Sequence, residues 1–481
     1  MRARKANACP AGSRETTAAL VLLACVASSQ CDVGRLLRNG RELNLLLITI
    51  DALRKDAVQP YAPDRPTAGI AEIGQLGTVF QWAYSLSNHT VPSIIGLFTS
   101  QPPSRFRFGR YYRIPLEYPS LAGLLGRRGY RTKALLGNWL LTDEEFGGLA
   151  GFESYLAVHH KSQDVLTDGT KIPGHGYHAR PPNTTRILAD AARNFIKRNR
   201  YNRFFLWVHF MDPHDPYAPP EEYLEHEVNP RLGTVIDFDR IFPEATGKFP
   251  DDFEAAENPL SEEEKEYVRQ LYMDEAAYVD DMVAEILEEL RTRELLSSTI
   301  VVLTADHGEE FWDHGELAHG NNYFDTSINV PLIIYHPYLP AAGVIDAPVS
   351  HLDVMPTLFG WFGFSPEPRH LGRSLAPLIR GEAFAESLIF SEEGGNRREG
   401  VSIVAGDVKV VFDSNCDNGA VVEFDSYGTR PRPRNEELRE LEEACRHFRT
   451  DNLLKAYFEG ERDPEYEQRR LDALRSLGYI E

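Results

Sequence analysis

The sequence has few cysteines, and most of them lie outside the part that we expect to fold. Of the five cysteines in 481 residues, only Cys416 and Cys445 lie beyond the first 31 residues, and there is no CxxC pair. A zinc site built on thiolates is therefore excluded. A disulfide between these two cysteines stays open, because an exported protein would permit it.

Positive charge is also scarce. The chain carries 51 Lys and Arg against 72 Asp and Glu, which gives a formal net charge of −21. This acidic balance argues against nucleic acid or an anionic membrane as the main partner. If the substrate is itself an anion, a local positive site is required, and a metal ion is the simplest one.

The apolar run near the N-terminus, AALVLLACVA at 18–27, is too short to span a bilayer comfortably. It follows a basic segment, so residues 1–31 are predicted to be a signal for export. The letters LLAC end at Cys25 and resemble a bacterial lipobox. The alternatives are a cleaved signal peptide with a periplasmic protein, a membrane-anchored lipoprotein acylated at Cys25, and a cytoplasmic protein with an irregular N-terminus.

Continuous apolar runs predict strands that are buried on both faces of a parallel sheet. They are 44–50, 204–210 and 298–305. Helical patterns separate them, at 120–129, 185–199 and 261–294. The alternation predicts an α/β fold, a three-layer sandwich with a large, mostly parallel central sheet. The last helix is predicted to begin with a capping box of Ser261 and Glu264. It is long enough to suggest a bend or two joined helices.

The pattern changes near residue 386. Short alternating segments there predict a small antiparallel-sheet subdomain, followed by a charged helical tail. Lys409 is expected at an ordinary exposed position of one of these strands. The predicted organisation is a signal over 1–31, a main domain over 42–385 and a C-terminal subdomain over 386–481.

Each of the predicted strands ends in side chains that bind metals or protons. They are Asp51, then His209, Asp212 and His214, then Asp306 and His307, with His314 and His319 a few residues further on. In open α/β sheets, ligands bind outside the carboxyl ends of the strands, so these groups are expected to meet in one crevice. Carboxylates and imidazoles without sulfur suit a divalent ion such as Ca, Mg, Mn or Zn.

Thr90 begins the stretch TVPS, which leads into an apolar helical segment. A threonine at this place predicts a helix N-cap, with Pro92 tolerated in the first turn. A helix N-terminus also presents free amides to an anion, and a nearby metal would make the hydroxyl a nucleophile. Both roles are expected together, with the cap directing Thr90 toward the metal.

The combination of motifs resembles the sulfatase family within the alkaline-phosphatase-like superfamily. The motifs run in the family's order, from IDALRKD through HTVPSIIGLFTS, HFMDPHDPY and TADHGEEFWDHGELAHG to NVPLIIYHP. The resemblance implies a metal site and a group of catalytic side chains. The implied metal ligands are Asp51, Asp306 and His307 together with the nucleophile Thr90. The implied helpers are His214 and His319, which hold the ester oxygens and protonate the leaving group, and Arg54, which pairs with Asp56 or supports the nucleophile.

The sequence departs from the family pattern at the nucleophile. Family members that cleave sulfate esters carry Cys or Ser there, which is oxidised to formylglycine, and an arginine four residues on. Here the residues are Thr90 and Ile94. Threonine cannot become formylglycine, because its β-carbon bears a methyl group. Further departures are Ala52 in place of a second carboxylate, and Asn138 and Leu140 in place of basic residues.

The resulting hypothesis is a metal-dependent hydrolase of sulfate or phosphate esters that acts through a covalent Thr90 intermediate. Phosphate esters are slightly favoured, as in phosphodiesterases with a threonine nucleophile. The substrate is expected to be a small-molecule, glycan or lipid ester. The alternatives are a phosphoglycerol- or phosphoethanolamine-type transferase, and a non-catalytic, lipid-anchored binding protein on a degenerate scaffold.

Overall fold

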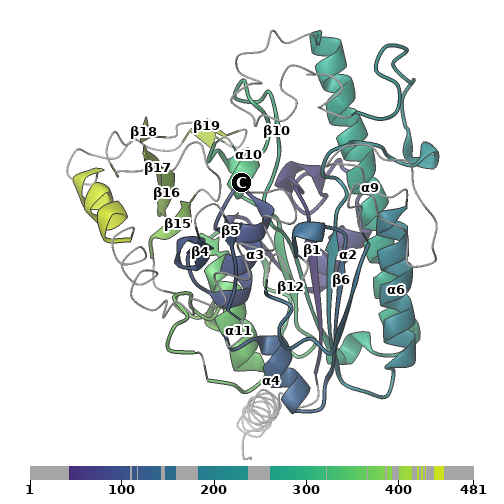
Figure 1. Cartoon of the computed structure of the whole chain (residues 1–481), viewed down its shortest axis with the longest axis vertical. Coiled ribbons are helices and arrows are strands. Elements are labelled where there is room, and N and C mark those ends of the chain that lie inside the picture. Colours follow the sequence, from purple (N-terminus) through teal and green to yellow (C-terminus); the bar gives the residue numbers. More distant parts are fainter. Residues whose placement is uncertain are drawn as a thin grey trace, which may run out of the picture.

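A mixed sheet of eight strands forms the middle layer of the protein (Figure 1). In spatial order its strands are β13 (Gly343–Ile345), β2 (Thr78–Phe80), β12 (Leu332–Tyr335), β9 (Thr299–Ala305), β1 (Asn44–Ile50), β8 (Phe204–Phe210), β6 (Arg131–Leu136) and β7 (Ser154–Ala157). Only β12 runs antiparallel to its neighbours β9 and β2. The predicted three-layer sandwich with a mostly parallel sheet is confirmed.

This computed structural model describes most of the chain from residue 43 to residue 448. The described ranges are 43–108, 111–115, 118–141, 147–158, 183–236, 260–320, 322–365, 367–384, 387–392, 400–413, 416, 420–421, 424–425, 428–429 and 438–448. The predicted export signal with Cys25 and the end of the helical tail lie outside these residues. Among the described helices, none has the length and apolar character needed to cross a membrane.

The three predicted apolar strands occupy the centre of the sheet as β9, β1 and β8. Every residue of these strands is buried. Their register places Thr49 beside His209 on one side and beside Thr304 on the other. Because parallel strands share their direction, their carboxyl ends lie along one edge of the sheet.

Helices cover both faces of the sheet (Figure 1). One face packs against α2 (Ala68–Leu76), α6 (Thr184–Arg198) and α9 (Glu262–Thr292). The other packs against α3 (Thr90–Thr99), α4 (Leu121–Arg127), α11 (Val354–Trp361) and α12 (Ala376–Ile379). Alternate residues of β1 serve the two cores, with Leu46 and Ile48 in the first and Leu45 and Leu47 in the second. Each such fully buried aliphatic side chain stabilises the fold by about 1.5–3 kcal/mol.

α9 is one uninterrupted helix of 31 residues, where its length had suggested a bend or two helices. No glycine or proline interrupts it, so nothing breaks its backbone hydrogen bonds. Ser261 and Glu264 form the predicted capping box at its start. The helix packs along α2 and α6, and its buried residues recur with helical spacing.

A separate antiparallel sheet follows the main domain. It consists of β15 (Ile389–Glu392), β16 (Gly400–Ala405), β17 (Val408–Asp413) and β18 (Ala420–Val421). A helix over 438–448 packs on it, and a disulfide joins Cys416 to Cys445. The predicted small C-terminal sheet is confirmed.

The C-terminal sheet is attached to the main domain by a buried ion pair. Lys409 on β17 binds Asp325 at the start of α10 (Asp325–Ile328), and both side chains are 1% exposed. The exposed position expected for Lys409 is therefore wrong, because this face of β17 lies against the main domain. Tyr323 adds a hydrogen bond of 2.8 Å to the carbonyl of Gly400.

Short elements complete the described part. Four two-residue strand pairs are β3 (Ala83–Tyr84) with β14 (Val349–Ser350), β4 (Arg107–Phe108) with β5 (Tyr111–Tyr112), β10 (Glu310–Phe311) with β11 (Leu317–Ala318), and β19 (Phe424–Asp425) with β20 (Gly428–Thr429). The 3-10 turns are η1 (Lys55–Ala57), η2 (Pro103–Phe106), η3 (Trp139–Leu141), η4 (Glu221–Tyr223), η6 (Leu296–Ser298) and η7 (His351–Asp353).

Candidate active site

Asp51, Asp306 and His307 meet where β1 and β9 end. Asp51 directly follows β1, and the other two residues directly follow β9, its parallel neighbour. All three side chains are fully buried. The convergence predicted from the strand ends is therefore present in the structure.

The three side chains form a tight cluster. One oxygen of each carboxylate and one nitrogen of the imidazole lie within 4.8 Å of one another. Nε2 of His307 is 3.5 Å from Oδ1 of Asp51 and 3.6 Å from Oδ2 of Asp306. These separations leave room for an ion between the three donor atoms, since each metal–ligand bond is about 2.0–2.6 Å.

The two oxygens of Asp306 have different surroundings. Oδ1 accepts hydrogen bonds from the amides of Ala52 at 3.1 Å and His307 at 2.9 Å. Ala52 adopts a left-handed φ of 54°, which turns its amide toward this oxygen. Oδ2 is buried and has no hydrogen-bond partner among the described residues. A buried carboxylate oxygen without a partner is costly unless a cation binds it.

His307 presents Nε2 to the cluster because its other nitrogen is bonded elsewhere. Nδ1 lies 2.8 Å from the carbonyl of Gly308, so it carries the proton and donates there. Gly308 must be a glycine, since a Cβ would lie 1.8 Å from the carbonyl oxygen of Thr326. Burial and the neighbouring His319 lower the pKa of His307 well below its ordinary value. The ring is therefore neutral, which is the form that binds a metal.

The two carboxylates repel each other in the absence of a cation. Burial and the charge of Asp51 raise the pKa of Asp306 well above its ordinary value. Burial opposes the charge on Asp51 as well, but His214, His209 and His307 outweigh it and lower the pKa of Asp51. A divalent ion would remove this conflict, and oxygen and imidazole donors suit Ca, Mg, Mn or Zn. The residues present therefore fit a divalent metal.

Thr90 lies against this cluster at the N-terminus of α3. Its Oγ1 is 3.4 Å from Oδ1 of Asp51 and 3.3 Å from Nε2 of His307. The predicted capping role is wrong: His89 is the N-cap, Thr90 is the first helical residue, and no side chain caps this end. The hydroxyl contacts Asp51 and His307, and a helix N-terminus presents free amides to an anion.

His214 and His319 stand beside the cluster. The ring centroid of His319 is 4.3 Å from that of His307 and 4.9 Å from that of His214. Nδ1 of His319 is 3.0 Å from the buried carboxylate of Glu309, and Nδ1 of His214 is 2.7 Å from the carbonyl of Asp215. Each ring therefore has its Nδ1 engaged by an oxygen of the protein.

The charge of His214 is set by its neighbours. Burial alone would lower its pKa, but the carboxylates of Asp215, Asp51 and Glu309 raise the pKa of His214 to about 9. The ring is thus an imidazolium at neutral pH. Together with a divalent ion in the cluster it would supply the local positive charge that the acidic chain requires for an anionic substrate.

Arg54 does not contact the cluster. Its guanidinium is buried and binds Asp56 at 2.7 Å and Asp313 at 2.6 Å. It also donates to the carbonyl of Glu309 at 3.0 Å. Of the two roles implied for it, the described contacts correspond to pairing with Asp56.

Two other strand-end residues face elsewhere. His314 stacks on Phe324 with ring centroids 3.6 Å apart and lies 3.1 Å from Glu310. Asp212 accepts a hydrogen bond from Thr185, near the start of α6. Within the described residues, only Asp51, Asp306 and His307 have the spacing of metal ligands.

No role was predicted for Asn138 or Glu309, and the structure brings both to the site together with the strand-end residue His209. Asn138 and His209 contact Asp51, at 2.7 Å and 3.2 Å, and Glu309 contacts His319. His209 is a fully buried residue of β8, and its partner there is Asp51. Strand register decides this contact, and a single sequence does not encode register visibly.

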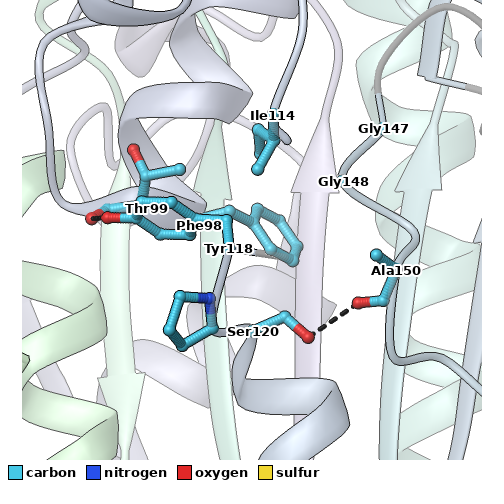
Figure 2. A pocket seen from close by; sticks show the side chains of 9 residues that line it. Phe98, Thr99, Ile114, Tyr118, Ser120, Gly147, Gly148 and Ala150 are labelled. Atoms are coloured by element: carbon cyan, nitrogen blue, oxygen red, sulfur yellow. Dashed lines mark hydrogen bonds between the residues drawn. The ribbon is translucent and has the colours of Figure 1, made fainter. Parts of the chain in front are cut away.

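A small pocket lies at the far end of α3 from Thr90 (Figure 2). In Figure 2 the hydroxyl of Ser120 reaches the carbonyl of Ala150, at 2.7 Å. The pocket has no carboxylate, imidazole or cationic side chain in its lining. Its lining residues are Phe98, Thr99, Ile114, Tyr118, Pro119, Ser120, Gly147, Gly148 and Ala150. It is therefore separate from the chemistry at the strand ends.

The fold and the donor set fit a metal-assisted hydrolase of the α/β class. Comparison with known proteins agrees. The family model "Sulfatase" matches residues 43–364. The chain therefore belongs to the sulfatase family and is an ester hydrolase of that family.

Relatives and solved structures support this assignment. Choline-sulfatase of Rhizobium meliloti is 27% identical over 72% of this chain and 73% of its own. Human iduronate 2-sulfatase is 32% identical over 63% of this chain and 62% of its own. The phosphonate monoester hydrolase of Silicibacter pomeroyi shares the fold at a TM-score of 0.64, with 19% identity over 85% of this chain and 96% of its own.

Proposed function

We propose that this protein cleaves phosphate or sulfate esters through a covalent ester on Thr90, with phosphate esters favoured. The observation that carries the proposal is the position of Oγ1 of Thr90, within 3.4 Å of Asp51 and 3.3 Å of His307 at a helix N-terminus. A hydroxyl held against a metal-type donor set is the arrangement of an activated nucleophile.

Asp51, Asp306 and His307 would hold a divalent metal ion, with Thr90 next to it. When bound, the ion supplies positive charge that favours the Thr90 alkoxide and the transferred oxygens. The identity of the metal is open among Ca, Mg, Mn and Zn, since all accept carboxylate and imidazole donors.

The first half-reaction transfers the phosphoryl or sulfuryl group to Thr90. The proton of Thr90 is released to water as its alkoxide forms, because Asp51, whose pKa is lowered, is a poor base. Oγ1 forms a bond to phosphorus or sulfur, and the bond to the leaving alcohol oxygen breaks. Nε2 of His214 or His319 gives a proton to that oxygen, which leaves as the alcohol.

The second half-reaction restores the enzyme. Water attacks the phosphorus or sulfur atom and gives a proton to the imidazole that acted as the acid. The bond to Oγ1 breaks, and Thr90 takes up a proton from water. Glu309 keeps the His319 ring in place through its bond to Nδ1, so that Nε2 faces the site in both halves.

Phosphate esters are favoured because the nucleophile is threonine. The formylglycine chemistry of sulfate-ester cleavage needs a Cys or Ser at this position, and Thr90 cannot supply it. The chain also shares its fold with a phosphonate monoester hydrolase. The choline-sulfatase relative keeps sulfate esters as the second substrate class to test.

The substrate is proposed to be a small-molecule, glycan or lipid ester in an exported setting. A solved structure of similar fold (TM-score 0.63, 18% identity, covering 87% of this chain and 99% of its own) contains D-glucosamine-2-N,6-O-disulfate. The disulfide between Cys416 and Cys445 supports export, since disulfides persist in oxidising compartments. Export as a periplasmic protein or as a lipoprotein anchored at Cys25 accords with the N-terminal pattern.

The test is a paired assay of an aryl sulfate, a phosphate monoester and a phosphodiester, each with Ca²⁺, Mg²⁺, Mn²⁺ and Zn²⁺. Thr90→Ala is expected to lose turnover, whereas Ser93→Ala is expected to keep it. Ser93 lies one turn further along α3, and its hydroxyl donates to the carbonyl of Ser87 at 2.7 Å. Mass spectrometry of the rapidly quenched wild-type protein should find one phosphoryl group on Thr90.

Other outcomes would select the alternatives. A burst of one equivalent, followed by slow turnover until an alcohol is added, would indicate a transferase. Metal binding without turnover of any of these esters would indicate a binding protein. Full activity in Thr90→Ala would contradict the covalent mechanism.

A further inference from the structure

The two oxygens of Asp51 face different partners. Oδ1 faces the site, toward Thr90 at 3.4 Å and His307 at 3.5 Å. Oδ2 faces the protein, where it is 2.7 Å from Nδ2 of Asn138 and 3.2 Å from Nε2 of His209. Two donors thus hold the oxygen that lies away from the nucleophile.

A chain of hydrogen bonds fixes the direction of the His209 contact. The indole N–H of Trp207 donates to Oγ1 of Thr49 at 2.9 Å. Oγ1 of Thr49 is 2.8 Å from Nδ1 of His209, and its proton has no other acceptor among the described residues. The hydroxyl therefore donates to Nδ1, which leaves the ring proton on Nε2, facing Asp51.

Asn138 is fixed in the same way. Its Oδ1 accepts the amide of Leu140 at 3.0 Å, so its Nδ2 is the group that donates to Asp51. The side chain is 3% exposed, and His209 is fully buried. Both donors are therefore held in place before any ligand arrives.

We propose that His209 and Asn138 are positioning residues, which clamp Oδ2 of Asp51 so that Oδ1 is presented to the metal and to Thr90. His209 is in turn oriented by Thr49 and Trp207. This inference rests on the proposed metal site, because the clamp acts through a metal ligand. It gives a role to Asn138, where the family pattern has a basic residue.

The neighbouring strand offers a matched control. Thr304 of β9 pairs in register with Thr49, and its Oγ1 is 2.8 Å from Nε2 of His351. His351 is as buried as His209. Among the described residues it has no contact with the metal cluster. A change at His351 therefore disturbs an equally buried Thr–His pair without touching Asp51.

The experiment measures metal affinity directly. The full chain is stripped with a chelator and titrated with Ca²⁺, Mg²⁺, Mn²⁺ and Zn²⁺ in a calorimeter. His209→Leu should weaken binding about 10- to 100-fold. His209→Gln should recover much of the affinity, because its amide can donate from near the place of Nε2. Asn138→Leu should also weaken binding, and Thr49→Val should do so to a smaller extent.

The controls are His351→Leu and Thr304→Val, which should bind metal as the wild type does. Equal affinity in wild type and His209→Leu would overturn the inference and leave the metal site intact. So would an equal loss in His351→Leu, since the effect would then be a general disturbance of the core. If the wild type binds none of the four ions, the proposed metal site itself fails. Should His209→Leu not fold, the comparison of Thr49→Val with Thr304→Val decides.

Discussion

Buried charges lie in two regions of this protein, and they are treated differently. Where the C-terminal sheet meets the main domain, Lys409 and Asp325 neutralise each other at 1% exposure. At the strand ends, Asp51 and Asp306 are equally buried but of the same sign, and none of their hydrogen bonds or ion pairs within the described residues comes from Lys or Arg. The charges of Lys409 and Asp325 balance each other. The charges of Asp51 and Asp306 are balanced only by a cation from outside.

The difference separates structural from functional charge. A buried ion pair keeps its cost low because each charge has its partner within the fold. A buried carboxylate with an unbonded oxygen, such as Oδ2 of Asp306, raises the energy of the folded chain and lowers that of a bound ion. The rules that relate sequence to a stable fold fail at such places, because the residues there serve function instead of stability.

The largest expected effect comes from removing one of the two like charges at the strand ends. Asp306→Asn should lower kcat/KM on nitrophenyl esters by about 10³-fold or more, because several kcal/mol of transition-state stabilisation go with the metal. The same variant should be at least as stable as the wild type in EDTA, since like-charge repulsion is relieved. Kinetics and thermal unfolding in EDTA measure the two effects.

Retained activity in Asp306→Asn would contradict the statement that the like charges at the strand ends serve function. A large loss of stability in EDTA would contradict the statement that these charges do not support the fold, because the carboxylate of Asp306 would then stabilise it as Asp325 does.

A change in the Lys409–Asp325 pair should have the opposite result, with a loss of stability and little change in activity. Lys409→Met leaves Asp325 buried without its counter-charge and should cost about 3–5 kcal/mol of unfolding free energy. The activity per folded molecule should change little, because the pair does not touch the cluster. Urea unfolding gives the first quantity, and kcat corrected for the folded fraction gives the second.

The double variant Lys409→Met with Asp325→Leu should recover most of the lost stability, since neither charge is then buried alone. If the double variant is less stable than Lys409→Met, the ion pair is not what makes the single change costly.

Metal addition should stabilise the folded chain by a smaller amount. At a free metal concentration of 100 times Kd, the unfolding free energy should rise by about 2.7 kcal/mol. Lys409→Met should keep this increment, and Asp306→Asn should lose it. Melting curves with and without metal test both statements, and an increment in Asp306→Asn equal to that of the wild type would place the ion elsewhere.

The smallest expected effect extends the comparison to histidines. The pKa of His214 is raised to about 9 among carboxylates, whereas burial lowers the pKa of His351 to about 3. A lowered folded pKa means that the stability contribution of His351 is complete above pH 6.5 and is lost as the pH falls toward 3. At pH 5 the loss should be about 2 kcal/mol.

His351→Gln should remove this part of the pH dependence. Urea unfolding in EDTA at pH 7 and pH 5 compares it with the wild type, and the chelator keeps metal release out of the difference. Equal pH dependence in the two proteins would show that His351 is not the titrating group.

Much of this could be predicted from the sequence. The apolar runs that form β1, β8 and β9 are visible in the sequence, because a strand buried on both faces needs an unbroken hydrophobic run. Asp51, Asp306 and His307 stood among the strand-end candidates, and the family resemblance selected them as metal ligands. The capping box of α9 was also visible, since it depends on residues three apart.

Other features could not be predicted. The turn of Thr90 away from a capping role depends on contacts with residues 39 and 217 positions away. The burial of Lys409 depends on the docking of a second sheet. The bond from Asn138 to Asp51 spans 87 positions, and the sequence pattern suggested only a missing basic group there.

By itself the sequence determined the α/β class, the strand ends that carry the ligands and the threonine that excludes formylglycine. These depend on composition and on short-range spacing. Only the tertiary structure decided which oxygen of each carboxylate is free, which nitrogen of each histidine faces the site, and which buried charges have partners. Those choices depend on strand register and long-range packing, in which single hydrogen bonds between distant residues set the direction of each side chain.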